Sequence, residues 1–164
     1  MRIFGLAGWS GSGKTTLLTA IIPHFVARGL VVSTIKHAHH EFDIDRPGKD
    51  SWHHRQAGAH EVTVASSRRW ALMHELRGAA EPSLEELTSQ MSPCDVLLVE
   101  GFKFHPHPKL EVHRPSVGKP LLYPEDPHIV AIASDEPLPA PLPLLPLGDP
   151  PAVAAFILDR LGLG

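Results

Sequence analysis

The chain has 164 residues, 43% of them hydrophobic, and its formal net charge is −3 at pH 7. This length and apolar content predict a single globular domain over residues 1–164, and the acidic balance argues against nucleic-acid binding, which favours a basic surface. No apolar run approaches the about 18 residues of a membrane span. No signal-peptide pattern precedes the first predicted strand, so we expect a cytoplasmic protein without membrane association.

Strand and helix patterns alternate along the chain. A strand is expected at 3–7, then a helix at 14–28 that contains Pro23 and ends at Gly29. The further expected elements are a strand at 30–37, a polar loop at 38–50, a short helix at 50–57, a hairpin of strands at 61–65 and 70–73, a helix with a capping box at 84–91, strands at 95–99, 109–113 and 129–133, a packed proline-rich segment at 137–151 and a helix at 151–161. This order predicts an α/β fold, a three-layer sandwich with a largely parallel central sheet and an antiparallel extension.

A glycine-rich loop joins the first strand to the first helix. Residues 8–15 spell G-W-S-G-S-G-K-T, a complete phosphate-binding motif in the strand–loop–helix context that it requires. Such a loop turns backbone N–H groups onto phosphate oxygens, its lysine reaches the β- and γ-phosphates, and its threonine hydroxyl binds Mg²⁺. We therefore predict a P-loop NTPase fold with a nucleotide site made by Gly8, Ser10, Gly11, Ser12, Gly13, Lys14 and Thr15.

Glu100 is the second feature of this predicted site. It follows the apolar run Val96-Leu97-Leu98-Val99, at the carboxyl end of a buried strand. An acid at this position holds Mg²⁺ directly or through water in P-loop proteins, and ligands collect at the carboxyl ends of parallel strands. We expect Thr15 and Glu100 to hold the metal; the alternative for Glu100 is a solvated loop acid.

The polar segment at 37–51 follows the second strand and is expected to leave the sheet at the same edge. Its carboxylates Asp43, Asp45 and Asp50 are candidates to orient water or metal near the γ-phosphate. Clustered imidazoles also raise a transition-metal site as an alternative, although no thiolate accompanies them. These histidines are His37, His39, His40, His53, His54, His105 and His107.

Base recognition and catalysis leave weaker signals. Asp135 follows the strand at 129–133, and its carboxylate either accepts guanine N–H groups or caps a turn. The chain has no asparagine, so the N-K-x-D guanine signature is absent. Neither a water-orienting glutamine nor an arginine finger is evident, which favours slow or partner-dependent hydrolysis.

Longer strings extend the pattern beyond the glycine loop. They are residues 8–16, I-K-H-x-H-H at 35–40, F-D-I-D-x-P-G-K-D-S at 42–51, A-G-A at 57–59, R-W-A-L at 69–72 and V-E-G-F-K at 99–103. In this order they resemble the MobB family, the adaptor proteins of molybdopterin-guanine dinucleotide biosynthesis. The resemblance runs from the N-terminus through Ser134-Asp135 and, more loosely, into the last helix. Dense prolines after Asp135 and the H-P-H-P string at 105–108 depart from the family pattern.

The resemblance implies a homodimer that binds GTP with Mg²⁺ and has weak intrinsic GTPase activity. Its implied partner is the MobA guanylyltransferase, which joins GMP to molybdopterin, and its implied role is accessory. Carried over by position, Gly11, Gly13, Lys14, Thr15 and Thr16 would bind phosphates, while Thr15 and Glu100 would serve Mg²⁺.

Two other function classes compete with this interpretation. A P-loop metallochaperone GTPase would use the clustered histidines, although such proteins usually carry cysteine motifs and this chain has only Cys94. A small-molecule kinase would share the glycine loop, but it would need an arginine-rich lid that the sequence does not display.

Overall fold

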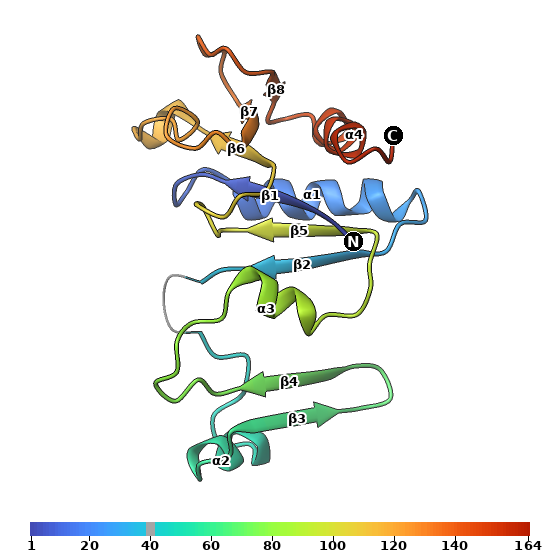
Figure 1. The fold of residues 1–164 in the computed structure, drawn as a ribbon, viewed down its shortest axis with the longest axis vertical. Helices are drawn as coiled ribbons and strands as arrows, with labels where there is room; N and C mark the ends of the chain where they lie inside the picture. Colours follow the sequence, from blue (N-terminus) through green and yellow to red (C-terminus); the bar gives the residue numbers. More distant parts are fainter. Residues whose placement is uncertain (39–41) are drawn as a thin grey trace. The chain divides into compact units, whose positions relative to one another are not determined.

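The computed structural model describes residues 1–38 and 42–164, which form two compact units (Figure 1). The first unit contains residues 1–37 and 91–164, and the second contains residues 38–90. His39 and His40 of the predicted histidine cluster lie outside the described residues. That residues 1–164 fold as a single domain stays a prediction.

The first unit is built on a six-stranded parallel sheet with the strand order β2-β5-β1-β6-β7-β8. Its strands are β1 (Arg2–Ala7), β2 (Val32–Lys36), β5 (Val96–Glu100), β6 (Lys109–His113), β7 (Ile129–Ser134) and β8 (Leu144–Pro146). All six strands run the same way, so the loops that follow them leave at one edge of the sheet.

Helices α1 (Lys14–Val26) and α4 (Pro150–Arg160) cover one face of this sheet with a single apolar core. Leu17, Ile21 and Phe25 recur at helical spacing on α1 and are almost fully buried. Pro23 lies inside α1 without ending it, and the helix gives way to the turn that contains Gly29. Asp149 caps α4 by accepting a hydrogen bond from the Ala152 N–H at 3.1 Å.

The other face of β6 is polar and buried. The Lys109 ammonium is fully buried and donates to Asp126 Oδ2 at 2.8 Å and to the His105 carbonyl at 2.7 Å. The Glu111 carboxylate accepts the backbone N–H groups of Leu122 and Tyr123, which holds the segment at 114–128 over the sheet. Burial raises the pKa of Glu111, and the two N–H donors oppose that shift.

His107 lies in the same network, against Gly5 of β1. Burial, reinforced by the neighbouring Lys109 charge, lowers the pKa of His107 to about 4. Its ring leaves no room for a side chain at position 5, because a Cβ there would lie 2.3 Å from His107 Nε2. The fifth residue of the chain is therefore fixed as glycine by packing alone.

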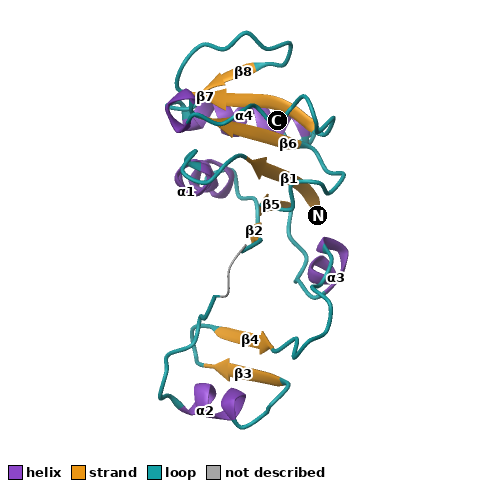
Figure 2. Ribbon diagram, turned by 90° about the vertical axis from the view of Figure 1, so that its left-hand side faces the viewer, coloured by secondary structure: helices purple, strands orange, loops and turns teal. Residues whose placement is uncertain are grey.

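The second unit contains a separate antiparallel pair, β3 (Glu61–Ala65) and β4 (Trp70–His74). Helix α2 (Asp50–Gln56) packs beside β3, and α3 (Leu84–Ser89) follows later in the chain (Figures 1 and 2). Ser83 caps α3 by a reciprocal capping box with Glu86, as the S-x-x-E spacing predicts.

The α/β fold class, with its largely parallel sheet and antiparallel strand pair, is confirmed. The prediction missed β8, a three-residue strand that pairs with β7 inside the proline-rich segment. It also missed the short 3₁₀ helix at Pro115–Val117.

Among the helices that the structure describes, none has the length and apolar character to cross a membrane.

The buried Lys109–Asp126 pair predicts an asymmetric stability effect. Asp126→Ala should lower the free energy of unfolding by about 3–5 kcal/mol, because it leaves the Lys109 charge buried without a counter-charge. The double variant Lys109→Met with Asp126→Leu removes both charges and should recover most of that loss. Urea unfolding of the three proteins measures this; equal losses in the single and double variants would contradict the prediction.

Candidate nucleotide site

The glycine loop is shaped by close packing against β6. Gly8 has φ of +146°, and a Cβ at this position would lie 2.4 Å from the Val112 carbonyl oxygen. Gly13 has φ of +96° and stands at the N-terminus of α1, where no side-chain cap is present. Residues with side chains rarely adopt these backbone angles, so the loop holds its shape only with glycine at these two positions.

Lys14 is folded back over the loop. Its ammonium donates to the Trp9 carbonyl at 2.9 Å. Burial lowers the pKa of Lys14; nearby Glu100 opposes that shift, whereas the like charges of Lys103 and Lys36 add to it. An anion beside Lys14 would offset both the burial and the repulsion between like charges.

Thr15 and Glu100, the two predicted metal ligands, are in direct contact. The Thr15 hydroxyl lies 2.9 Å from Glu100 Oε1 and 3.1 Å from Oε2. Glu100 is buried at the end of β5, and Lys36 Nζ lies 3.7 Å from Oε1. A hydroxyl and a carboxylate fit Mg²⁺, which prefers oxygen ligands and usually takes only one or two from the protein when it also binds phosphates.

The other predicted loop residues line the same turn. Ser10 and Gly11 are exposed, and Thr16 is exposed in the first turn of α1. Ser12 is 2% exposed, and its hydroxyl has no hydrogen-bond partner among the residues that the structure describes. The loop thus presents its backbone to solvent at Ser10 and Gly11 and buries its side chain at Ser12.

Trp9 ties the loop to neighbouring segments. Its indole N–H donates to the Pro120 carbonyl at 2.7 Å. The ammonium groups of Lys103 and Lys119 lie 4.7 Å and 5.8 Å from the indole ring centroid, within the range of cation–π attraction. The mouth of the loop therefore has a basic rim.

Asp135 is found at the end of β7, where the sequence predicts it, and it is paired with Arg114. Arg114 Nη1 donates to Asp135 Oδ2 at 2.6 Å, and Arg114 Nε donates to the Ser12 carbonyl at 3.2 Å. Sequence reasoning missed Arg114. The available signal was its position directly after the strand at 109–113, the same criterion that picks out Glu100 and Asp135.

Asp45 and Asp50 belong to the second unit. Asp45 accepts hydrogen bonds from the Ser51 hydroxyl at 2.8 Å and from Arg55 Nε at 3.2 Å, while Asp50 begins α2. Arg55 also contacts the carboxylates of Asp43 and Glu75. Asp45 thus has a structural role within its own unit, and the catalytic roles of Asp45 and Asp50 stay predictions.

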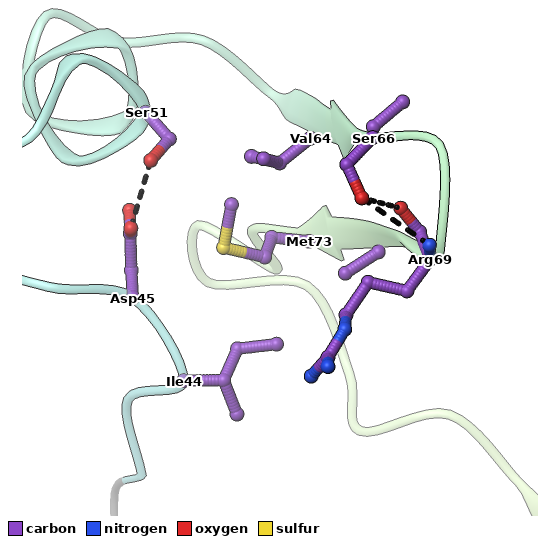
Figure 3. Close-up of a pocket in the computed structure, with 9 residues that line it drawn as sticks. Ile44, Asp45, Ser51, Val64, Ser66, Arg69 and Met73 are labelled. Carbon is purple, nitrogen blue, oxygen red and sulfur yellow. Dashed lines mark hydrogen bonds between the residues drawn. The ribbon is translucent and has the colours of Figure 1, made fainter.

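A shallow pocket of about 330 Å³ lies in the second unit between Asp45 and the β3–β4 hairpin (Figure 3). Val64 and Met73 form an apolar floor with Ile44, and the Asp45–Ser51 hydrogen bond crosses one rim. None of the described residues that line it is a glycine, so the pocket does not have the glycine turn of a phosphate loop.

No three His, Cys, Asp or Glu side chains within residues 1–38 and 42–164 gather in a way that could hold a metal ion. His105 and His107 do meet, with 2.9 Å between their Nδ1 atoms, and the Lys109 ammonium donates to the His105 carbonyl. The described residues therefore give the metallochaperone alternative no support.

Comparison with known proteins identifies the family. The family model "Molybdopterin guanine dinucleotide synthesis protein B" matches residues 3–135. The chain belongs to this family. An Escherichia coli (strain K12) protein named molybdopterin-guanine dinucleotide biosynthesis adapter protein is 44% identical over 160 residues, which cover 96% of this chain and 91% of that protein. A Haemophilus influenzae protein of the same name is 44% identical over 162 residues, covering 97% and 89% of the two chains.

A solved structure agrees with this MobB assignment. The crystal structure of Bacillus subtilis MobB superposes with a TM-score of 0.79 at 25% identity, and the match covers 98% of each chain. The resemblance seen in the sequence is therefore confirmed at the level of family and fold.

The packing of the glycine loop predicts that its glycines differ in tolerance. Gly11 also has positive φ, at +82°, but no atom of the described part of the chain lies within 4 Å of the position that its Cβ would take. Gly11→Ala should cost ~1 kcal/mol of stability for the left-handed backbone alone. Gly8→Ala adds a clash with the Val112 carbonyl and should cost about 3 kcal/mol. Thermal unfolding compares the two variants, and equal melting temperatures would contradict the predicted packing.

Proposed function

We propose that this chain binds GTP with Mg²⁺ at the glycine loop and acts as an adaptor for a MobA-like guanylyltransferase in molybdopterin-guanine dinucleotide synthesis. Family membership supports an adapter role in this synthesis. The observation that carries GTP binding is the contact between Thr15 and Glu100 beside the folded-back Lys14. These residues supply a cation for the phosphates and two oxygens for the metal.

Hydrolysis of the bound nucleotide is proposed to be weak. Fast hydrolysis needs a group that orients the attacking water, commonly a glutamine, and a cation on the transferred phosphate. The chain has two glutamines, Gln56 and Gln90, and neither lies in the glycine loop or at the ends of β5, β6 and β7. Arg114 is the arginine that touches the loop, and it contacts the Ser12 carbonyl and Asp135. The site is thus better suited to holding a nucleotide than to turning it over.

A homodimer is proposed on the basis of the β3–β4 hairpin. Trp70 and Leu72 alternate along β4 with less exposed residues, and they are 68% and 43% exposed. A two-stranded sheet is marginally stable by itself, and neighbouring exposed apolar side chains mark an association surface. A second copy of the chain would cover this surface and complete the sheet.

Lys14→Ala should abolish GTP binding, with at least a hundredfold loss of affinity, while the domain stays folded because the Lys14 ammonium is hydrogen-bonded to the Trp9 carbonyl within the loop and is outside the apolar core. Titration calorimetry with Mg²⁺ and GTP measures the affinity, and circular dichroism checks the fold. Arg28→Ala, at an exposed basic residue just beyond α1, is the control and should bind GTP as the unmodified protein does. Unchanged affinity in Lys14→Ala would refute the proposed site.

Trp70→Asp should convert the proposed dimer to a monomer, because a charge in a buried apolar interface is strongly disfavoured. Sedimentation velocity reports the change in mass. Arg68→Asp places the same carboxylate in the exposed hairpin turn and should leave the assembly intact. A monomeric unmodified protein at micromolar concentration would contradict the homodimer.

Co-purification tests the partner. The chain should retain a MobA-like guanylyltransferase from extracts of its source cell, and retention should depend on added GTP if the loaded site is the form that the enzyme recognises. Lys14→Ala provides the comparison, since it should retain the enzyme equally with and without GTP.

A further inference from the structure

Three neighbouring strands deliver three functional groups to one place. The phosphate loop follows β1, Arg114 follows β6 and Asp135 follows β7, and these strands lie side by side in that order. Ala7, the last residue of β1, pairs with Glu111, so β6 runs two residues farther along the phosphate loop, and the last residues of β6 and β7, His113 and Ser134, pair with each other. Arg114 therefore emerges between the loop and Asp135 because of strand pairing, even though 102 residues separate it from Ser12.

The Arg114 guanidinium bridges the two flanking groups. Nε donates to the Ser12 carbonyl at 3.2 Å, and Nη1 donates to Asp135 Oδ2 at 2.6 Å. A Cβ at Gly13 would lie 3.4 Å from Arg114 Nε and 3.6 Å from Nη2, so the guanidinium lies against the Ser12–Gly13 peptide. The side chains of Arg114 and Asp135 remain 38% and 33% exposed, which leaves both accessible to a ligand.

With this bridge formed, Asp135 and Arg114 still have free positions that a guanine base could contact. A carboxylate has about four acceptor positions, so Asp135 retains Oδ1 after Oδ2 accepts from Arg114. That oxygen can accept the N1–H and exocyclic N–H of guanine. Adenine instead presents an acceptor at N1, which repels the Asp135 carboxylate. The planar guanidinium of Arg114 also offers a flat cationic surface on which an aromatic ring stacks.

We infer that Arg114 is a positioning residue for guanine recognition, because it fixes the Asp135 carboxylate to the backbone of the phosphate loop. The inference rests on the proposed GTP binding. Arg114 makes the base-reading group and the phosphate-binding loop one connected unit, so that a base in contact with Asp135 is held at a set distance from the phosphates. The residues that follow two strands, β6 and β7, thus together form a base-recognition group that a single sequence motif would otherwise supply.

The test compares nucleotides that differ only in the base. In the full-length protein, Arg114→Ala should reduce the preference for GTP over ATP about tenfold, and Asp135→Ala should do the same. Because the two residues act through one bridge, the double variant should lose little more than either single variant. Titration calorimetry with Mg²⁺ and each triphosphate provides the affinities. Arg28→Ala, at an exposed arginine just beyond α1, is the matched control and should keep the preference.

A change of base specificity separates positioning from simple stabilisation. In Asp135→Asn, Arg114 can donate to the amide oxygen and leave the amide N–H₂ facing the base. That donor suits the 2-carbonyl of xanthine, so Asp135→Asn should favour xanthosine triphosphate over GTP. Adding Arg114→Ala should remove this new preference, whereas a purely structural role for Arg114 would weaken both nucleotides equally. If Arg114→Ala lowers the melting temperature, Arg114→Lys is used in its place to test the positioning role. This variant keeps the positive charge but cannot donate to Ser12 and Asp135 from two nitrogens at once.

The outcomes distinguish the inference from the proposal beneath it. An unmodified protein that binds neither GTP nor ATP refutes the proposed function itself. If the unmodified protein prefers GTP and Lys14→Ala abolishes binding, but the Arg114 variants keep that preference, then GTP binding stands and the role of Arg114 is refuted. Additive losses in the Arg114 and Asp135 variants would refute it as well.

Discussion

The position of β1 in the middle of the parallel sheet determines the rest of the site. β1 pairs with β5 on one side and with β6 on the other, and both neighbours run in the same direction. The loop after β1 consequently has the Glu100 carboxylate on one flank and Arg114 on the other. The close approach of Gly8 to the Val112 carbonyl then fixes the loop against β6. The backbone freedom of glycine allows the loop to turn, and strand pairing determines which side chains lie beside it.

The two sides of the phosphate loop differ in the groups that they present to a ligand. On the β5 side, Glu100 and Thr15 offer oxygens for a divalent cation, with Lys36 nearby. On the β6 side, Arg114 offers donors, and its charge is balanced by Asp135. Burial lowers the pKa of Lys14, which lies close to Glu100, so an anionic ligand would favour its charged form. This division of charge suits a ligand with a metal-bound phosphate at one end and a polar ring at the other.

The sequence predicts this site unevenly, for physical reasons. The glycine loop and Glu100 could be predicted because each is encoded in a short continuous string whose flanking residues form the required strand or helix. The bridge between Arg114 and Asp135 could not, because it depends on which strands become neighbours in the sheet. β8 was missed because proline removes a ladder donor and is confined to edge strands and strand ends. The structure places Pro146 at the last position of an edge strand, where that loss is tolerated.

The contact between Gly5 and His107 has an evolutionary consequence. These residues are far apart in the sequence, yet a Cβ at position 5 would meet His107 Nε2 at 2.3 Å and the Lys109 side chain at 2.9 Å. A larger side chain at position 5 is therefore blocked until the histidine has been replaced by a smaller residue and the lysine side chain has moved or been replaced. Substitution at these sites must follow an order, with the change at or just before the start of β6 first and the change in β1 second. Lineages that enlarge position 5 should carry the trace of that order as paired replacements.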